Sequence, residues 1–393
     1  MKDQRFVVSA GPHHRHKCPL ITRLPWAGEP LPAVFGITDL TADHTAPAQL
    51  MPWLAGAQEI CFAWILEDLA PGHAREFALT PQPPAAGAGV ELADAGAGRI
   101  EVNLDGDLFT AYNFGSELAR PNLHPLIGPG GRHVTRDYPM AQGPAGERSD
   151  HIHHRSVWVA HGDVNGTDNW SELEGHGRTV HRDFARREAG PVMGVLEARS
   201  QWVTAGGEPL LEERLAMIFY NLPAEWRCFD LDLDLRPSAG EVRFGDTKEG
   251  GLCGVRVATS MDAKLDGRIE NAYGGVQEAE TWGKRAHWCD YSGPVQGEIV
   301  GIAIFDHPNS FRHPTYWHVR DYGLMTANPF ALSHYFDDPA RDGSHVLHPG
   351  ETMALRYRIY LHLGDAGGGA VADKYHDFIN PPRVALAEGG GHG

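Results

Sequence analysis

The sequence predicts an all-β fold, organised as a large antiparallel β-sandwich. Apolar and polar residues alternate with period two in several segments, most strictly over residues 229–236, as in strands that bury one face. Helical periodicity is scarce along the chain. The 47 glycines and 28 prolines lie mostly between the alternating segments, where turns are expected. Together these observations favour many short strands joined by turns.

Individual strands follow from local patterns. Residues 99–112 predict a hairpin with Asp105-Gly106 at its turn, and residues 198–220 predict another across Gly206-Gly207. Further strands are predicted over residues 229–235, 252–258, 299–305 and 355–363. The segment 299–305 is apolar throughout, which predicts a strand that is covered on both faces.

Composition divides the chain into three parts. Residues 1–90 are a β-rich N-terminal section, either a small domain or outer strands of the same sandwich. This section ends in a linker rich in Pro, Ala and Gly over 81–89. Residues 95–365 are expected to form the main β-sandwich domain with the active site. Residues 366–393 are a C-terminal segment, with a helix over 370–379 and a flexible tail from Ala385. A second short helix is expected within 47–54.

Charge and cysteine usage restrict the function and the compartment. The 34 basic and 51 acidic residues give a net charge of −17, so binding to nucleic acid or an anionic membrane is not expected. No segment is apolar enough for a signal peptide or a transmembrane span. The five cysteines are odd in number and widely spaced, which predicts free thiols in a reducing compartment, the cytoplasm.

The segment 150–163 is the most unusual, because it contains four histidines, Arg155 and two aspartates. Its second half is rich in β-forming residues and predicts a strand. A strand that begins early would place His151, His153, Arg155 and His161 on one face, and Ile152, His154, Ser156 and Trp158 on the other. Histidine titrates near neutral pH and binds metals, so this pattern predicts an acid–base or metal site. The alternative is a surface strand with solvated histidines.

Two later segments carry similar groups beside apolar strands. Asp246, Lys248 and Glu249 precede the strand at 252–258, and the loop over 306–323 contains further histidines, arginines and aromatic residues. Charged groups are costly beside apolar strands unless they share a hydrated pocket. The three segments are therefore predicted to converge on one concave face. The alternatives are a solvated turn at 246–249 and an aromatic plug at 306–323.

These clusters supply the candidate site residues. The candidates for catalysis are His153, His154, Asp246, Lys248 and Glu249. The candidates for substrate binding are Arg155, His161, Asp163, Trp170, His313, Trp317, His318 and Arg320. His151 and His153 have the spacing of two metal ligands on one strand face, so a divalent metal is left open as a cofactor. No HExxH motif or cysteine cluster points to a particular metal.

Four segments resemble a bacterial family usually called PmoA-like. They are residues 120–140, 150–166, 246–256 and 304–323, and the resemblance covers about residues 95–365. The family's label, methane oxygenase, implies a metal-dependent oxygenase, whereas its members tend to accompany sugar oxidoreductases and transporters. The chain is also similar in strand content and length to the galactose-mutarotase-type supersandwich. That likeness implies His153 or His154 as general acid and Glu249 or Asp246 as general base on a ring sugar.

The function favoured by the sequence is a carbohydrate-active enzyme that uses general acid–base chemistry. Its substrate would be a sugar, a glycoside or an oxidised (keto) glycoside, and the enzyme would be a lyase, a hydrolase or an epimerase. The 10 Trp, 11 Tyr and 23 His suit such a small-molecule partner. A non-catalytic sugar-binding β-sandwich and a metal-dependent oxygenase are the alternatives. Assembly into a homo-oligomer is left open.

Overall fold

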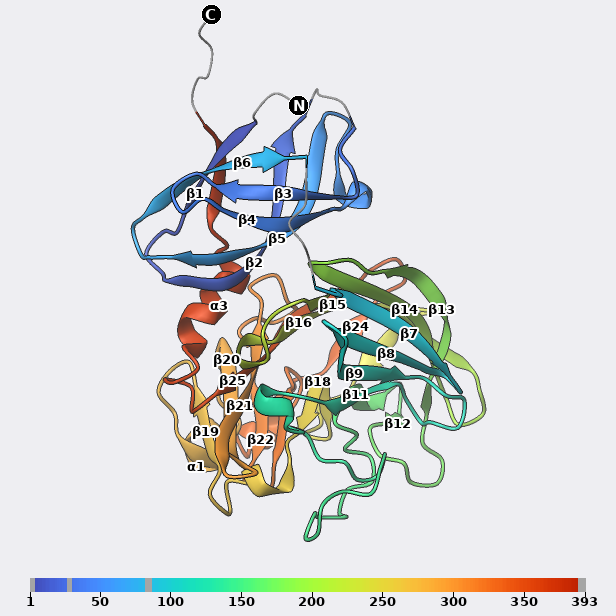
Figure 1. The fold of residues 1–393 in the computed structure, drawn as a ribbon. Coiled ribbons are helices and arrows are strands. Elements are labelled where there is room, and N and C mark those ends of the chain that lie inside the picture. Colours follow the sequence, from blue (N-terminus) through green and yellow to red (C-terminus); the bar gives the residue numbers. More distant parts are fainter. Residues whose placement is uncertain (1–3, 27–29, 82–86, 388–393) are drawn as a thin grey trace, which may run out of the picture.

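The computed structural model describes residues 4–26, 30–81 and 87–387, and its strands form three sheets. Every strand ladder among these residues is antiparallel, from β1 with β26 to β8 with β9. Figure 1 shows the N-terminal sheet, in blue, above a larger body that contains the other two sheets. The predicted all-β antiparallel sandwich is therefore confirmed.

The N-terminal sheet has seven strands, in the order β2-β5-β4-β3-β6-β1-β26. They are β1 (Arg5–Ser9), β2 (Arg15–Pro25), β3 (Val34–Asp39), β4 (His44–Leu50), β5 (Glu59–Leu69), β6 (Ala74–Thr80) and β26 (Arg383–Leu386). Because β26 pairs with β1, Ala385 and Leu386 lie in a strand, and the prediction of a flexible tail from Ala385 is wrong there. The last part of that tail, 388–393, and most of the predicted linker, 82–86, lie outside the described residues.

The second sheet has eleven strands and carries the candidate site. They are β7 (Val90–Gly96), β8 (Arg99–Leu104), β9 (Asp107–Asn113), β10 (Asn122–Leu126), β11 (Val157–Val164), β12 (Thr167–Asn169), β17 (Val242–Phe244), β18 (Gly250–Arg256), β22 (Trp317–Arg320), β23 (Leu324–Ala327) and β24 (His345–Leu347). The main path across the sheet is β22-β23-β18-β11-β10-β9-β8-β7.

The third sheet has eight strands, in the order β13-β14-β15-β16-β25-β21-β20-β19. They are β13 (Arg178–Glu188), β14 (Met193–Val203), β15 (Pro209–Tyr220), β16 (Cys228–Pro237), β19 (Arg268–Asn271), β20 (Trp288–Val295), β21 (Glu298–Asp306) and β25 (Met353–Leu363). The predicted strands at 229–235, 299–305 and 355–363 lie within β16, β21 and β25, and the segment 252–258 largely coincides with β18.

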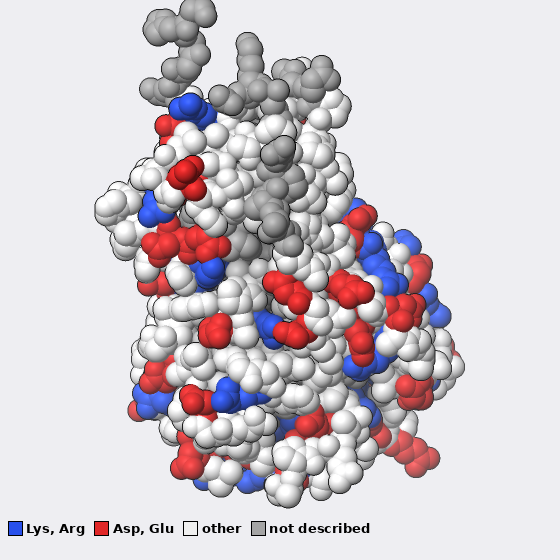
Figure 2. Space-filling view, in the orientation of Figure 1, with Lys and Arg blue, Asp and Glu red and all other residues white. Residues whose placement is uncertain are grey.

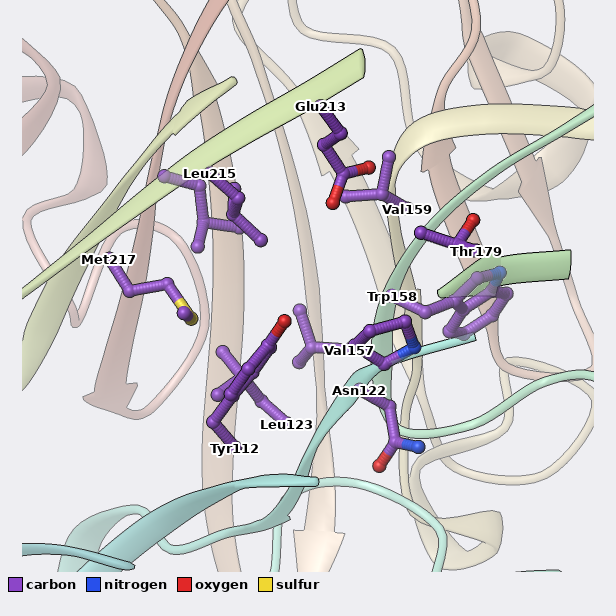
Figure 3. A pocket seen from close by; sticks show the side chains of 12 residues that line it. Tyr112, Asn122, Leu123, Val157, Trp158, Val159, Thr179, Glu213, Leu215 and Met217 are labelled. Carbon is purple, nitrogen blue, oxygen red and sulfur yellow. The ribbon is translucent and has the colours of Figure 1, made fainter. Parts of the chain in front are cut away.

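The main core lies between the eleven-stranded and eight-stranded sheets. Val102, Val157 and Val255 from the eleven-stranded sheet belong to one core cluster with Leu233 and Ile302 from the eight-stranded sheet. Period-two alternation explains this packing, because every second residue of each strand faces the other sheet. Figure 3 shows a small interior pocket, of about 20 Å³, where Val157 and Val159 point inward and Trp158 points away.

Helices are few and short. They are α1 (Gln277–Thr281), α2 (Leu332–Tyr335) and α3 (Val371–Ile379), with 3₁₀ turns at Pro52–Leu54, Pro129–Gly131, Ala224–Trp226 and Thr259–Met261. The helix expected over 370–379 is confirmed as α3. The helix expected within 47–54 is wrong, because residues up to Leu50 pair as β4 with β3 and β5, which leaves one 3₁₀ turn. No helix in the described part of the chain is long and apolar enough to cross a membrane.

Helix α3 connects the N-terminal sheet to the sandwich. The side chains of Arg15 and Asp377, from β2 and α3, form a buried ion pair with an N–O distance of 3.0 Å. Cys61 of β5 and Tyr375 of α3 share an apolar cluster with Phe305 of β21.

The division of the chain into the parts 1–90, 95–365 and 366–393 stays a prediction. All five cysteines are buried free thiols, as expected.

The surface carries charges of both signs. Acidic and basic side chains are interspersed over the face shown in Figure 2.

Candidate functional site

One face of the eleven-stranded sheet carries a continuous row of directly paired residues. This outward row runs through Arg99, Asn113, Asn122, Trp158, Gly254, Thr326 and His318. The next row runs through Ile100, Tyr112, Leu123, Val157, Val255, Met325 and Val319 and lies in the core. Paired residues share a face and sequence neighbours take opposite faces, so the outward row points away from the core. Its six strand spacings make it about 29 Å long, at roughly 4.8 Å each.

The histidine loop, residues 150–156, precedes β11 rather than belonging to it. His151 and Ser156 have φ of 46° and 56°, which an extended strand does not contain. The prediction that His151, His153, Arg155 and His161 share one strand face is therefore wrong, because the strand begins only at Val157. The loop instead folds its histidines over the outward side of Trp158.

Four rings stack on one another above the sheet. The ring of Tyr322 lies on His151, His151 on His154, and His154 on Trp158, with centroid distances of 5.2, 4.7 and 5.4 Å and interplanar angles of 6°, 6° and 19°. Gly254 makes room for this stack, because a Cβ there would lie 3.1 Å from Cε2 of Trp158. The stack fixes the orientation of both imidazole rings.

Two buried arginines hold His154. Its Nδ1 accepts a hydrogen bond from Nη1 of Arg256 at 3.0 Å, and Asp150 Oδ1 accepts from Arg256 and from Arg136, at 2.9 and 2.6 Å. Arg136 also donates to the main-chain oxygen atoms of His151 and His154. Burial, together with the charges of His153 and Arg256, lowers the pKa of His154 well below its ordinary value. His154 is thus neutral, with its proton on Nε2.

A second arginine pair lies beside His153. Arg155 binds Glu172 through two hydrogen bonds of 2.7 Å, and Arg120 lies 3.4 Å from the same carboxylate. Burial, and after it the charge of Arg120, lowers the pKa of His153 to about 4. The buried ring of Trp170 meets the ring of His153 edge to face at 5.8 Å. His153 is therefore an unprotonated base at neutral pH.

The end of the outward row at β22 adds a further set of polar groups. Nδ1 of His318 accepts from Nε1 of Trp282 at 3.1 Å, and burial together with the charges of Arg320 and Lys248 lowers its pKa to about 3. The exposed Glu249 directly precedes β18, and its main-chain oxygen accepts from the N–H of Gly162 at 2.7 Å, so it lies beside β11. Within the described residues, neither Lys248 nor Glu249 has an ion-pair partner.

The opposite end of the row opens into a pocket of about 360 Å³. Arg99 donates to Oδ1 of Asn113 at 2.8 Å, and Nδ2 of Asn113 donates to Oδ1 of Asn122 at 3.2 Å. Arg155, which belongs to the histidine loop, lines this pocket. The pocket thus adjoins the stacked rings.

Several predicted site residues lie elsewhere. His161 is fully buried between Phe244 and Phe330, and its imidazole bonds to the main-chain oxygen of Gly245 at 3.0 Å. Trp317 is also fully buried and donates to the main-chain oxygen of Ala286. Both point inward, because His161 alternates with Val157 and Val159 on the inner face of β11, and Trp317 shares the inner face of β22 with Val319. They are core residues, which corrects their prediction as binding residues.

Three other candidates have structural partners. Asp163 accepts from the main-chain N–H of Gly166 within a tight turn. Asp246 accepts from the Ser333 N–H and hydroxyl and from the Gly343 N–H, so its carboxylate fixes the loop around α2. His313 bonds to Asp306 and lies apart from the histidine loop. From the other two predicted clusters, Tyr322 stacks on His151, and Arg320 lies over the ring of Tyr322 at 5.4 Å from its centroid. His318 lies in the outward row, and the charge of Lys248 contributes to the lowered pKa of His318.

The described residues do not form a metal site around the histidine loop. Nδ1 of His151 lies 2.9 Å from Oδ2 of Asp150, and its ring is held in the stack. No group of three or more His, Cys, Asp or Glu side chains in the described part of the chain is placed to hold a metal ion. His151 and His153 therefore do not fit a three-ligand site.

The sequence did not reveal the residues that position the histidines. Arg120, Arg136 and Arg256 are fully buried, and their partners are the carboxylates Asp150 and Glu172. One signal was present, since Arg256 ends an otherwise apolar strand, and a charge there needs a buried partner. Nothing in the sequence indicated that Tyr322 would stack on His151.

The comparisons with known proteins add a family. A family of unknown function, DUF6807, matches residues 99–376. The chain belongs to this family. The DUF6807 match extends from β8 into α3 and so includes the outward row, the histidine loop and both end groups. The family description does not include the PmoA-like label, so that resemblance stays a prediction. No curated protein matches the chain.

Two solved structures from Enterococcus faecalis are similar in part. One is described as a protein in the glycosyl hydrolase family 38, with 10% identity and a TM-score of 0.46, and the other as an alpha-mannosidase, with 12% identity and a TM-score of 0.45. Each match covers 98% of this chain but only 47% and 46% of the other chains. This DUF6807 member thus spans less than half of their length, and its chemistry has to be inferred from its own residues.

Proposed function

We propose that the chain is an enzyme that removes a proton beside a carbonyl group of an oxidised (keto) glycoside, with β-elimination or epimerisation as the result. The observation that carries this proposal is the bond from Arg256 to Nδ1 of His154, which keeps the imidazole neutral and its Nε2–H free to donate. A neutral imidazole donor stabilises a developing enolate oxygen without first losing a proton.

Each remaining role follows from the environment of a group. Glu249 is exposed and lacks an ion-pair partner in the described chain, so its carboxylate is the base that takes the proton. Lys248 supplies a positive charge near the developing oxyanion. His153, with a pKa of about 4, is a second unprotonated base. The sugar would lie against the exposed side of His151 and Tyr322.

Proton abstraction is favoured over hydrolysis by two carboxylates. Hydrolysis of that kind needs one free carboxylate and one protonated carboxylic acid across the bond. The carboxylates of Asp150, Glu172 and Glu278 are each paired with arginine. Glu249 is then the remaining candidate among the carboxylates named here, and one is enough for enolate chemistry.

A p-nitrophenyl glycoside oxidised at C3 tests the proposal. Loss of the C2 proton to the base and breakage of the C1–O bond would form an enone and release p-nitrophenol. We expect Glu249→Gln and His154→Ala to lower kcat about 10²–10⁴-fold without change in circular dichroism. Glu298→Gln, an exposed glutamate at the start of β21, is the matched control and should keep the wild-type rate.

The two alternatives give different results. A sugar-binding module would bind the probe without releasing p-nitrophenol, and its variants would change affinity alone. A metal-dependent oxygenase would lose activity on exhaustive chelation, whereas proton abstraction by Glu249 should survive it. Wild-type rates in both variants would mean that the reaction takes place elsewhere.

A further inference from the structure

Four side chains form a hydrogen-bonded line at one end of β19, β20 and β21, apart from the histidine loop. Asp306 Oδ2 lies 2.9 Å from Nδ1 of His313, Nε2 of His313 lies 3.2 Å from Nδ1 of His287, and Nε2 of His287 lies 2.9 Å from the hydroxyl of Tyr273. Asp306 ends β21, His287 precedes β20, and Tyr273 follows β19, so the pairing of these three strands brings the groups together.

The acceptor at the inner end fixes the direction of every bond in the line. A carboxylate oxygen accepts, so Nδ1 of His313 carries a proton and its Nε2 is the acceptor for Nδ1–H of His287. Nε2 of His287 then accepts the hydroxyl proton of Tyr273. The two imidazole rings are nearly parallel, with planes that differ by 22° and centroids 5.2 Å apart. Burial and the neighbouring His313 lower the pKa of His287, which keeps this ring neutral.

Exposure rises from one end of the line to the other. Asp306 is fully buried, the His313 side chain is 12% exposed, and Tyr273 is 63% exposed. Another histidine–aspartate pair, His362 with Asp290 at 2.8 Å, has both of its members fully buried. The line from Asp306 differs because it ends at a hydroxyl that a molecule in solution can reach.

We propose that Tyr273 is the nucleophile of a second reactive centre, which accepts an acyl group from a carboxylic ester. The hydroxyl oxygen attacks the ester carbonyl carbon while its proton passes to Nε2 of His287. The positive charge that His287 gains is stabilised through its hydrogen bond to His313, which the carboxylate of Asp306 orients. Collapse of the tetrahedral intermediate breaks the bond to the leaving alkoxide, which takes a proton back from His287. An acylated Tyr273 and a free alcohol remain.

p-Nitrophenyl acetate tests this centre on the full chain. Release of p-nitrophenolate is followed by absorbance, and the acetylated residue is located by mass spectrometry of peptides. We expect Tyr273 to be acetylated ahead of the other ten of the 11 tyrosines. Tyr273→Phe, a change at an exposed side chain, should remove this fast phase and leave the fold intact. His287→Ala should slow acetylation of Tyr273 about 10²-fold or more.

Chemical rescue separates base catalysis from a structural role. Added imidazole should restore acetylation of Tyr273 in His287→Ala, because the small base takes the place of the missing ring. His307→Asn is the matched control, since His307 lies in the same region and its side chain, among the described residues, hydrogen-bonds only to the Asn309 N–H. Absence of acetyl-Tyr273 in the wild type would overturn the proposal. Equal rates of Tyr273 acetylation in the wild type and His287→Ala would overturn it too.

Discussion

Nη1 of Arg256 lies 3.0 Å from Nδ1 of His154, both side chains are buried, and the ring of His154 belongs to the stack. A guanidinium group only donates, so this contact assigns the imidazole proton to Nε2. The same arginine bonds to Asp150, which in turn binds Arg136. One partly exposed carboxylate thus orients two buried arginines, and these fix the tautomer and position of the histidine that we propose acts on substrate.

The first prediction concerns the charge of Arg256. Arg256→Gln keeps a hydrogen-bond donor near His154 but removes a positive charge that lowers its pKa. We therefore expect the pKa of His154 to rise in this variant, as measured by the pH titration of its ring signals in NMR spectra. Arg148→Gln is the control, because Arg148 pairs with Asp262 instead. An unchanged His154 titration in Arg256→Gln would contradict the proposed role of this arginine.

The second prediction concerns Gly254 under the stack. A methyl group there would lie 3.1 Å from Cε2 of Trp158, whose ring is held by His154 and Trp170. Gly254→Ala should lower the free energy of unfolding by about 1–3 kcal/mol and reduce activity, because the stacked rings cannot move aside. Gly367→Ala, at an exposed position where the nearest atom is 3.4 Å away, should have little effect in denaturant unfolding.

The third prediction separates Asp246 from Glu249. Asp246 accepts two hydrogen bonds on Oδ2, from the N–H groups of Ser333 and Gly343, and one on Oδ1 from the Ser333 hydroxyl. Asparagine has no negative charge, and one of the two oxygens is replaced by an amide nitrogen that only donates. Asp246→Asn should therefore destabilise the protein by about 1–3 kcal/mol in chemical unfolding. The exposed Asp266→Asn is its control. If Asp246→Asn keeps full stability but loses turnover, Asp246 is the base and our assignment to Glu249 is wrong.

The fourth prediction is a pH dependence of stability. Glu213 lies in the interior pocket of Figure 3, and burial raises its pKa from 4.5 to about 7. Between these two values the folded protein holds a proton that the unfolded chain has lost. Stability should therefore fall as pH rises from about 4.5 to about 7, by roughly 3 kcal/mol, and stay lower above that range.

Glu213→Gln should remove this dependence. The amide oxygen can still accept from Nε1 of Trp202, which donates to Glu213 at 2.8 Å. We expect the variant to be more stable than the wild type at about pH 9 and not at about pH 5, in denaturant titrations. Glu212→Gln, at the exposed neighbouring position, should follow the wild-type curve. Parallel curves for Glu213→Gln and the wild type would contradict the burial of a charged group here.

Local pattern predicted the strands better than the site. The alternation over 229–236 placed Phe229, Leu231, Leu233 and Leu235 in the core as expected, although Asp230 is also buried, in an ion pair with Arg358. In the segment 150–163 the same rule failed. Its residues have β-forming character only from Ser156 onward, and the extension of the strand to His151 had no support beyond the histidines themselves. Left-handed backbone at Ser156 ends the pattern.

The sequence by itself determined that this protein is built of antiparallel strands with one buried face, because side-chain alternation within a strand is set locally. Tertiary structure decided which polar residues meet. Arg99, Trp158 and His318 share the outward row only because seven strands pair in one register, and a shift of one residue in any ladder would point its members to the opposite face. The buried charge of Arg256 depends on the same pairing, since it is stable inside the protein only beside the carboxylate of Asp150.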